Sequence, residues 1–348
     1  MKEVSVGVAG TAKNSGKTTT LVTLLGKLKK ENIAAVGLTG IGYDGESFDN
    51  VTGLPKPRVD VYEGMIVAVT EKCVKYARAK IEPLLQTDIR TALGRIVIGK
   101  VTEAGKLVLA GPVKKSDLRK TLNFMRDCGA ELVFVDGALG RVAPFAEVDG
   151  LILATGASRN SNISELALEN EHLIKLLRRP VMAEKGVTAR IGSVLSEESF
   201  SAFLDSFAVA DTIIVEGLLS GRFLGAITKN KELCGRLRGK RLLFDSSFKL
   251  LLAGKINETW DAIGEMERDL EIGVLKPAHV VSVTVNPYYP KYRYTTRDYE
   301  AAYVDKAELR GAIGNSMSLP CYDVVAGGVN ELYMDVLNYY NKQRMEAL

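Results

Sequence analysis

The sequence predicts an α/β protein, built on a mainly parallel, doubly wound sheet with a second α/β unit after it. Three observations lead to this fold class. The apolar run at residues 4–9 passes through a loop of small and polar residues into a helical pattern. The apolar run at residues 132–135 fits a strand that is buried on both faces and closes on Asp136. Short β-rich runs then alternate with helical stretches along the rest of the chain.

The other elements of the first half follow from the spacing of apolar residues. Leucines recur at helical spacing over residues 18–30, which predicts a helix directly after the loop. Ser116 and Asp117 are residue types that cap helix N-termini, so a second helix should begin there. The remaining elements expected in this half are a strand at 34–38, a helix at 74–85, a hairpin that pairs 95–101 with 106–110, a strand at 151–154 and a helix at 163–177.

The second half repeats the alternation of strands and helices. Its expected strands lie at 212–217, 241–245, 280–285 and 322–325. Length and repetition favour two domains, 1–184 and 185–348, but the pattern leaves open whether the second half extends the first sheet. Glu216 and Asp245 follow strands of this half, where open α/β sheets bind ligands, although helix or turn caps explain such acids equally well.

Composition and charge bound the class of protein. The chain has 348 residues, of which 46% are hydrophobic and 25% are charged, as in ordinary globular proteins. A net charge of +4 without a basic block does not indicate nucleic acid as a partner. No signal-peptide pattern opens the chain and no apolar run approaches the ~20 residues of a membrane helix, so we expect a cytoplasmic protein without a membrane partner.

Cysteines and histidines do not suggest a metal centre of their own. The four cysteines are far apart and form no C-x-x-C pair, which argues against a zinc site or a disulfide framework. Only two histidines are present, and each is more typical of a structural residue. These residues are Cys73, Cys128, Cys234, Cys321, His172 and His279. Hydrolytic chemistry would therefore depend on Mg²⁺ and carboxylates.

The loop after the first strand has the composition of a phosphate-binding loop. Its small residues let backbone N–H groups turn toward phosphate oxygens, and the N-terminus of the following helix favours negative charge. Lys17 can reach the terminal phosphates and Thr18 can ligate Mg²⁺. The residues expected to contact the nucleotide are Gly10, Thr11, Ala12, Lys13, Asn14, Ser15, Gly16, Lys17, Thr18 and Thr19. No G-x-G-x-x-G follows the strand, which disfavours a dinucleotide site.

The spacing of this loop departs from the common G-x-x-x-x-G-K-[ST] pattern, because Thr11 stands where the first glycine is expected and Gly10 precedes it. The resulting G-x₅-G-K-T resembles the loop of dethiobiotin synthetase and the cobyrinic acid synthetases, which group with the nitrogenase-iron-protein and MinD-type ATPases. The resemblance implies ATP as the nucleotide and a possible homodimer. It does not carry over the signature lysine of that class, because Ala12 holds the position and Lys13 lies one step away.

Two regions offer oxygen ligands for Mg²⁺. Asp136 closes a buried strand in the manner of a Walker B motif, and Gly137 and Gly140 let the next loop pass close to the γ-phosphate. The acidic loop at 39–50 should lie beside the phosphate loop, although a solvated loop would look the same. The expected catalytic residues are Lys17, Asp44, Asp136 and Arg141, and the expected metal ligands are Thr18, Asp49 and Asp136.

The segment at residues 286–297 concentrates tyrosines among lysines and arginines. Such a cluster can stack on a base or ribose, or contact a partner protein. A packed surface loop is an equally good interpretation, since tyrosine often anchors irregular structure. Single-stranded nucleic acid is less favoured, because the cluster stands alone in a nearly neutral chain.

Two classes of function fit a phosphate loop. A ligase activates a small carboxylate with ATP, whereas a partner-acting ATPase uses hydrolysis on another protein. The second α/β half favours the partner-acting ATPase, because dethiobiotin-type ligases are usually compact. ATP is favoured over GTP, since residues 230–233 lack the aspartate of the guanine-reading N-K-x-D motif.

A second resemblance makes the partner more specific. Residues 41–57, taken with the loop at 10–18, resemble the family of ATPase subunits that reactivate lysine 5,6-aminomutase. This resemblance implies a second reactivase subunit and a B12-dependent aminomutase as partners. In that family, damaged cobalamin is exchanged at the expense of ATP, in amino-acid fermentation.

Overall fold

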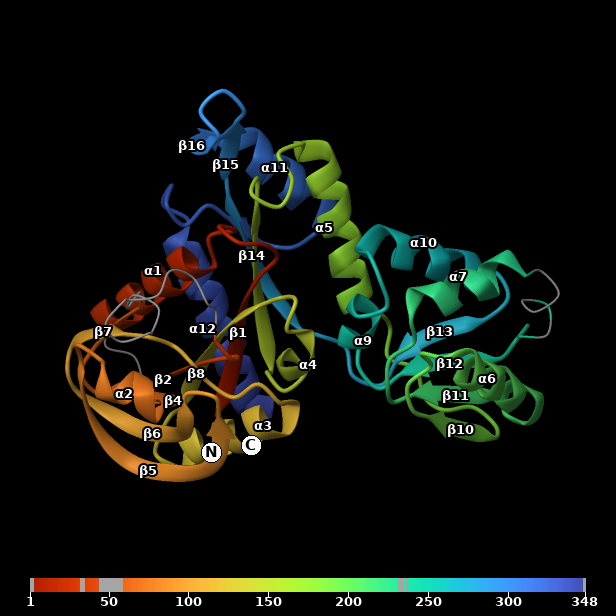
Figure 1. The fold of residues 1–348 in the computed structure, drawn as a ribbon, viewed down its shortest axis with the longest axis horizontal. Coiled ribbons are helices and arrows are strands. Elements are labelled where there is room, and N and C mark those ends of the chain that lie inside the picture. Colours follow the sequence, from red (N-terminus) through yellow and green to blue (C-terminus); the bar gives the residue numbers. More distant parts are fainter. Residues whose placement is uncertain (1–2, 32–34, 44–58, 231–234, 236, 347–348) are drawn as a thin grey trace. The chain divides into compact units, whose positions relative to one another are not determined.

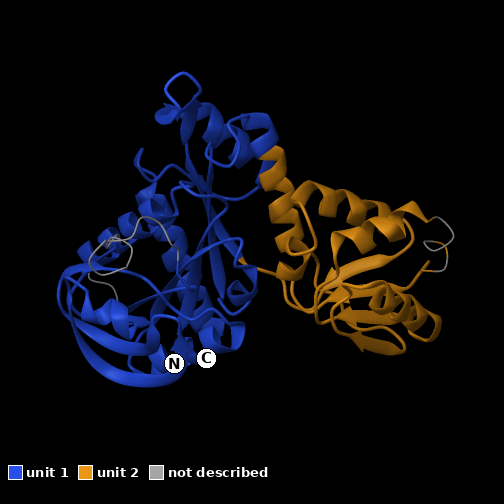
Figure 2. Cartoon of the chain, in the orientation of Figure 1, with its two compact units in different colours: residues 1–166, 280–348 blue, residues 167–279 orange. Residues whose placement is uncertain are grey.

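The computed structural model describes residues 3–31, 35–43, 59–230, 235 and 237–346. The chain forms two compact units, shown in Figure 2. The first comprises Met1–Leu166 and Val280–Leu348, and the second comprises Ala167–His279. The second unit is therefore an insertion into the first.

The first unit is organised around one large sheet, which has nine strands among the described residues. In order across the sheet these are β17 (Cys321–Tyr322), β14 (Val280–Asn286), β9 (Gly150–Gly156), β1 (Val4–Gly10), β8 (Leu132–Ala138), β2 (Val36–Gly40), β4 (Ile66–Thr70), β6 (Gly94–Glu103) and β5 (Lys80–Thr91). Neighbouring strands run parallel from β17 to β4. Strands β6 and β5 are antiparallel to their neighbours and close one edge.

Helices cover both faces of this sheet (Figure 1). Helices α1 (Lys17–Lys30) and α12 (Val329–Glu346) pack together over the face that carries Val6 and Val8. On the other face, Phe145 of the short α4 (Val142–Phe145) lies against Gly7 of β1. Helix α3 (Lys115–Asp127) packs beside α4. The expected doubly wound α/β fold is confirmed.

The centre of the sheet is apolar because both of its faces are covered. Every residue of β1 and β9 is buried, as expected for central parallel strands. Helix α1 buries leucines on one stripe, each of which contributes roughly 1.5–3 kcal/mol by leaving water. These are Leu21, Leu24, Leu25 and Leu28. The polar Ser5 is tolerated within β1 because its hydroxyl donates to Asp149 Oδ2 at 2.7 Å.

Two expectations for the first half are wrong. Residues 74–85 do not form one helix. Helix α2 (Glu71–Lys75) ends at Lys75, and strand β5 begins at Lys80. Residues 95–101 do not pair with 106–110, because β6 lies between β4 and β5 and has both edges occupied. Strand β7 (Gly105–Leu107) pairs with β3 (Val59–Val61) instead. In both cases cross-strand pairing outweighs the local pattern.

The second unit has a separate sheet and a separate core. Its four strands are all parallel, in the order β10 (Thr188–Ile191), β11 (Thr212–Val215), β12 (Arg241–Phe244) and β13 (Glu271–Val274). The described helices between these strands are α6 (Glu197–Val209), α7 (Gly221–Lys229), α9 (Phe248–Leu251) and α10 (Ile256–Met266). Phe203, Phe223 and Phe244 are buried at its centre.

The division of the chain differs from the expected domains 1–184 and 185–348. The boundary falls within α5 (Ile163–Leu177), and the chain returns to the first unit at β14. The reason is pairing: β14 adds to the sheet beside β9, and β17 adds beside β14. Helix α11 (Lys306–Met317) packs on these two strands. Within the described ranges, no helix combines the length and apolarity needed to cross a membrane.

Candidate nucleotide-binding site

The loop between β1 and α1 wraps around an open space at the carboxyl end of β1. Its backbone reaches the left-handed region twice, at Asn14 with φ 60° and at Gly16 with φ 90°. Only short polar residues and glycine adopt this conformation readily, which explains these two residue types. A Cβ at Gly10 would lie 2.9 Å from Ser15 Oγ, so a larger residue there would have to displace the Ser15 side chain.

The N-terminus of α1 has no capping side chain, which suits it to bind an anion. Gly16 is its N-cap, with no side-chain capping hydrogen bond, and its first turn holds no acidic residue. The first amides of a helix lack partners within the helix, and the helix dipole places positive charge there. Basic residues gather in the last turn instead, at Lys27, Lys29 and Lys30. The start of α1 thus carries neither a capping side chain nor an acidic residue.

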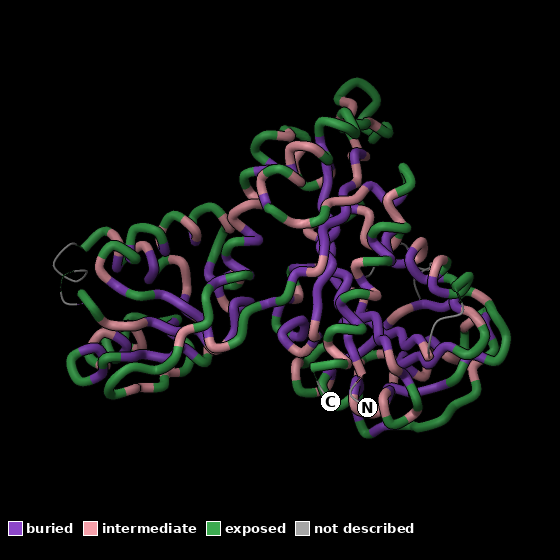
Figure 3. Tube along the Cα trace, turned by 180° about the vertical axis from the view of Figure 1, so that it is seen from behind, coloured by how far each residue is buried: buried purple, intermediate pink, exposed green. Residues whose placement is uncertain are grey.

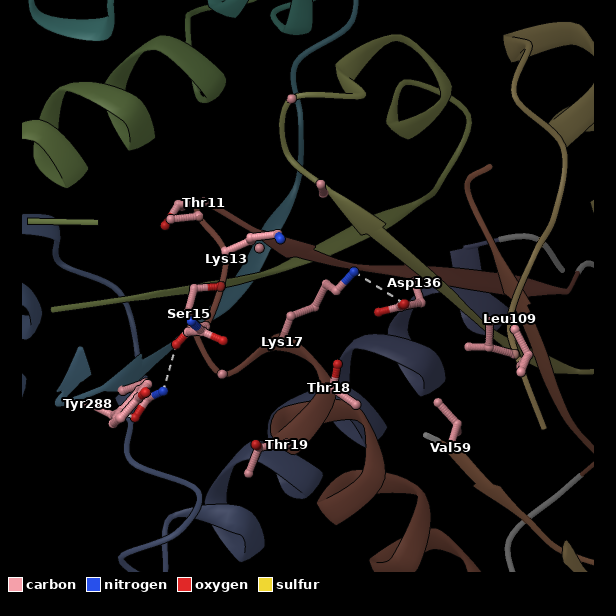
Figure 4. Close-up of a pocket in the computed structure, with 18 of the residues that line it drawn as sticks. Thr11, Lys13, Ser15, Lys17, Thr18, Thr19, Val59, Leu109, Asp136 and Tyr288 are labelled. Carbon is pink, nitrogen blue, oxygen red and sulfur yellow. Dashed lines mark hydrogen bonds and ion pairs between the residues drawn. The ribbon is translucent and has the colours of Figure 1, made fainter. Parts of the chain in front are cut away.

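A cavity of about 460 Å³ lies over the loop (Figure 4). All ten residues from Gly10 to Thr19 line it. The other lining residues are Val59, Leu107, Val108, Leu109, Asp136, Ala138, Gly140, Asn286 and Tyr288. The cavity thus joins the loop to the carboxyl ends of β8 and β14, at the edge where open α/β sheets bind ligands.

Lys17 and Asp136 face each other across this cavity (Figure 4). The Lys17 Nζ to Asp136 Oδ2 distance is 3.2 Å, and only 13% and 18% of their side chains are exposed. Parallel pairing of β1 with β8 sets this geometry, since Val8 lies opposite Asp136 in the register. Asp136 is further fixed through its carbonyl, which accepts a hydrogen bond from Ile41 N at 2.7 Å.

Neighbouring strands hold the loop in place. Thr11 N donates to Ala154 O at 2.9 Å, and the Thr11 hydroxyl donates to the Thr155 hydroxyl at 3.0 Å. Asn286 Nδ2 donates to Asn14 O at 2.8 Å. Ser15 Oγ is buried and has no hydrogen-bond partner among the described residues. A buried hydroxyl without a partner is costly, so its place in the loop suits a ligand that accepts from it.

The structure places Arg141 away from the position expected for phosphate chemistry. Its Nη1 donates to Ile41 O at 2.6 Å and its Nη2 donates to Tyr43 O at 2.5 Å. It is absent from the described residues that line the cavity. The guanidinium therefore ties the loop after β8 to the end of β2. The catalytic or metal-binding roles expected for Asp44 and Asp49 lie outside the described residues.

Sequence reasoning did not assign some of the cavity's walls. Asn286 and Tyr288 belong to the aromatic segment that the sequence singled out, but nothing in the pattern joined that segment to the loop. Val59 and residues 107–109 lie in short strands or connections without a recognisable motif. A sequence pattern that could have found these residues is an acid or amide near the end of a buried strand. Both Asp136 and Asn286 fit this pattern.

Comparisons with known proteins add little to this geometry. No family model matches the chain, and no curated protein matches it. Among solved structures, pNOB8 ParA bound to nonspecific DNA matches at 11% sequence identity with a TM-score of 0.28. That match covers 77% of this chain and 98% of the other. Because so low a TM-score marks only a distant likeness, the site rests on its own geometry. The order of strand, loop, helix and aspartate-bearing strand is the one that a phosphate-binding loop pattern predicts.

Proposed function

We propose that this protein binds Mg²⁺–ATP over the loop at residues 10–19 and hydrolyses it to act on a partner protein. One observation carries the nucleotide part of the proposal. A cavity of about 460 Å³ brings together a helix N-terminus without a capping side chain, a largely buried lysine and a carboxylate near the end of a strand. Each of these groups matches one part of a nucleoside triphosphate with its metal.

The residues present fit Mg²⁺ as well as phosphate. In nucleotide sites, Mg²⁺ takes one or two protein oxygens and completes its shell with phosphates and water. The Thr18 hydroxyl and the Asp136 carboxylate both line the cavity and supply such oxygens. Bound there, the metal neutralises charge that develops on the phosphates. Among the described residues, no group of three or more His, Cys, Asp or Glu side chains lies close enough to hold a metal by itself.

Different residues of the chain would bind the phosphates and the metal. Amides of the loop and of the first turn of α1 hold phosphate oxygens, and Lys17 offsets their charge. Asp136, now paired with Lys17, would offer its carboxylate to Mg²⁺, and Lys17 would face the terminal phosphates. The Ser15 hydroxyl gains the partner it otherwise lacks.

Action on a partner protein is favoured by what the first unit carries beyond a nucleotide site. The whole of Ala167–His279 is inserted into it, and tyrosines follow the strand that lines the cavity. Neither is required for activating a small carboxylate. The resemblance of residues 10–18 and 41–57 to reactivase subunits makes a B12-dependent aminomutase the first partner to try.

The nucleotide part is tested by isothermal titration of Mg²⁺–ATP. Lys17→Ala should weaken binding by about 10- to 100-fold, as charge-assisted hydrogen bonds worth roughly 1.5–3 kcal/mol are lost. Lys30→Ala is the matched control, because Lys30 is exposed at the far end of the same helix. Equal affinity of the two folded variants would refute the assignment.

The partner part is tested by ATP turnover. The isolated chain should hydrolyse ATP slowly, and an aminomutase carrying damaged cobalamin should raise that rate. A ligase would instead respond to a small carboxylate and release ADP in proportion to product. A single small acid that raises turnover strongly, with no effect of added proteins, would replace the partner-acting proposal by the ligase.

A further inference from the structure

The cavity over the loop differs in charge on the two sides of Lys17 (Figure 4). On one side lies Asp136, whose carboxylate pairs with Lys17 Nζ at 3.2 Å. On the opposite side, Asn286 and Tyr288 reach the cavity from the end of β14. Neither of these two side chains is charged. This side of the cavity therefore suits an uncharged group better than a further phosphate.

The proposed nucleotide site sets the direction of a bound triphosphate. In a phosphate loop, backbone amides hold the α- and β-phosphates, whereas the lysine reaches the β- and γ-phosphates. The γ-phosphate is then directed toward Lys17 and Asp136, and the α-phosphate toward the loop. A nucleoside attached to the α-phosphate continues away from Asp136, which leads to Tyr288. Leu109 lies on the other side of Lys17, with Asp136 (Figure 4).

The backbone of Tyr288 is held where two strands meet. Tyr288 opens β15 (Tyr288–Arg293), which pairs with β16 (Asp298–Tyr303) in a hairpin directly after β14. Figure 3 shows the chain passing from the buried β14 into this more exposed hairpin. Tyr288 N also donates to Asn286 Oδ1 at 3.2 Å. A residue that is already ordered loses less conformational freedom when a ligand binds to it.

The Tyr288 ring has an edge contact but no stacked partner among the described residues. Its centroid lies 5.7 Å from that of Tyr303, with 64° between the two ring planes. A ring has two faces, and a contact of this kind covers at most one of them. The bases of nucleotides are flat π-systems, and their stacking on aromatic side chains contributes to affinity whichever base is present.

Asn286 connects the Tyr288 backbone to the loop. Its Nδ2 donates to Asn14 O at 2.8 Å, while its Oδ1 accepts from Tyr288 N. Its backbone carbonyl accepts from Ala157 N at 2.9 Å, beside β9. The amide of one side chain thus ties Tyr288 to the loop that would hold the phosphates, so the ring and the loop keep a fixed spacing.

We propose that Tyr288 stacks on the base of the bound nucleotide. This proposal rests on the proposed nucleotide site and names the residue that holds the nucleoside there. Stacking accepts any base, so Tyr288 separates nucleotides from plain polyphosphates and does not by itself select adenine.

The first experiment compares Mg²⁺–ATP with Mg²⁺–tripolyphosphate, which keeps three phosphates and has no nucleoside. Isothermal titration measures the affinity of both ligands for the wild-type chain and for Tyr288→Ala. The variant should bind ATP about 5- to 150-fold more weakly, the range expected when a stacking aromatic side chain is replaced by alanine. Its affinity for tripolyphosphate should be unchanged, because that ligand has no base. Equal losses for both ligands, or no loss for ATP, overturn the proposal.

Three further variants control for shape and for folding. Tyr288→Phe keeps the ring and should bind ATP as the wild-type chain does. Tyr288→Leu keeps apolar volume without the ring and should bind ATP as weakly as Tyr288→Ala. Tyr299→Ala should bind normally, since Tyr299 is 67% exposed on β16 and is absent from the described lining of the cavity. If Tyr288→Ala misfolds, the other two Tyr288 variants decide, and equal ATP affinity of these two overturns the proposal.

The second experiment uses the wild-type chain. The photoreactive analogue 2-azido-ATP, whose azide is on the adenine ring, is bound with Mg²⁺ and irradiated, and mass spectrometry locates the label. The label should appear at Tyr288 or at the residues next to it, and excess ATP should prevent labelling. Label confined to any other part of the chain, such as residues 107–109, overturns the proposal.

The proposed function and the stacking fail in different ways. If neither ATP nor tripolyphosphate binds the wild-type chain, the nucleotide site is refuted and the stacking with it. If both ligands bind, and Lys17→Ala weakens both while Tyr288→Ala weakens neither, the nucleotide site stands and the stacking is refuted.

Discussion

At the scale of single residues, the site is defined by the ion pair between Lys17 and Asp136. Both side chains are largely buried, at 13% and 18% exposure, and both make further interactions besides this pair. The pair holds both residues in the wall of the cavity.

The variant Asp136→Asn should lower ATP hydrolysis by about 100-fold or more, because the amide keeps the shape of the carboxylate but loses its charge toward Mg²⁺. Thermal melting should shift by only a few degrees. Turnover and melting of the purified variant check both statements. Full activity would transfer the metal role to another acid.

At the same scale, Arg141 donates hydrogen bonds to the carbonyls of Ile41 and Tyr43, which join the loop after β8 to the end of β2. Arg141→Ala should destabilise the chain by about 1–3 kcal/mol, since it removes two charge-assisted hydrogen bonds. ATP affinity should change less than threefold. Urea unfolding and ATP titration measure the two effects. A large loss of ATP affinity with normal stability would return Arg141 to the phosphate.

Burial raises the pKa of the Cys321 thiol to about 12, from an ordinary value of 9.0. The folded chain thus favours the neutral thiol, so this contribution to stability is complete below pH 9 and is lost as pH rises toward 12. We expect the stability of the wild-type chain to fall more steeply from pH 9 to 11 than that of Cys321→Ala. Parallel urea titrations that gave equal slopes would contradict this.

At the scale of elements, the beginning of α1 does what a single residue cannot. The helix supplies several amides and a dipole, and the left-handed Gly16 turns them toward the cavity. Strand β14 approaches from the other side, since a Cβ at Gly16 would lie 3.1 Å from Asn286 Cβ. The element boundary is therefore fixed both by backbone conformation and by close packing.

Two glycines of α1 should respond to alanine in opposite directions. Gly16→Ala should destabilise the chain by about 1–2 kcal/mol and weaken ATP binding, because an L-residue is strained at φ 90°. Gly26→Ala should stabilise it by about 0.5–1 kcal/mol, because Gly26 is exposed within the helix with no atom within 4 Å of its added Cβ. Urea unfolding of the two variants measures both changes. If both variants changed the free energy of unfolding in the same direction, the structure would be contradicted.

At the scale of the whole molecule, the chain is one unit interrupted by another. Ala167–His279 has its own parallel sheet and its own buried core, with Phe203 and Phe244 in it. A domain with its own core can fold without its host. The insertion thus adds surface without interrupting the sheet that carries the cavity.

The inserted unit should fold by itself when it is expressed as residues 163–279, which retain the whole of α5. We expect a cooperative thermal transition and dispersed amide resonances. A continuous fragment 185–348 should be unfolded or aggregated, because it separates β14 and β17 from β9. A folded 185–348 fragment would support the domain boundary drawn from sequence.

The sequence by itself determined the parts of this protein that are local. The loop between β1 and α1, the helix after it and the strand that carries Asp136 follow from patterns within about 15 residues, where backbone periodicity and turn chemistry act directly. The strand runs on to Ala138, two residues beyond its expected end at Asp136. The α/β class followed in the same way, from the repeated alternation of strands and helices. These elements form as predicted because tertiary contacts do not override their local preferences.

Tertiary structure alone decided which strands are neighbours. Residues 280–286 are apolar enough for either sheet, and pairing with β9 brings Asn286 to Asn14 across 272 positions of the chain. Residues 80–91 likewise become a strand because β6 offers them hydrogen bonds. A strand that is buried on both faces carries no local mark of its partners, since register and pairing depend on the packing of the whole core.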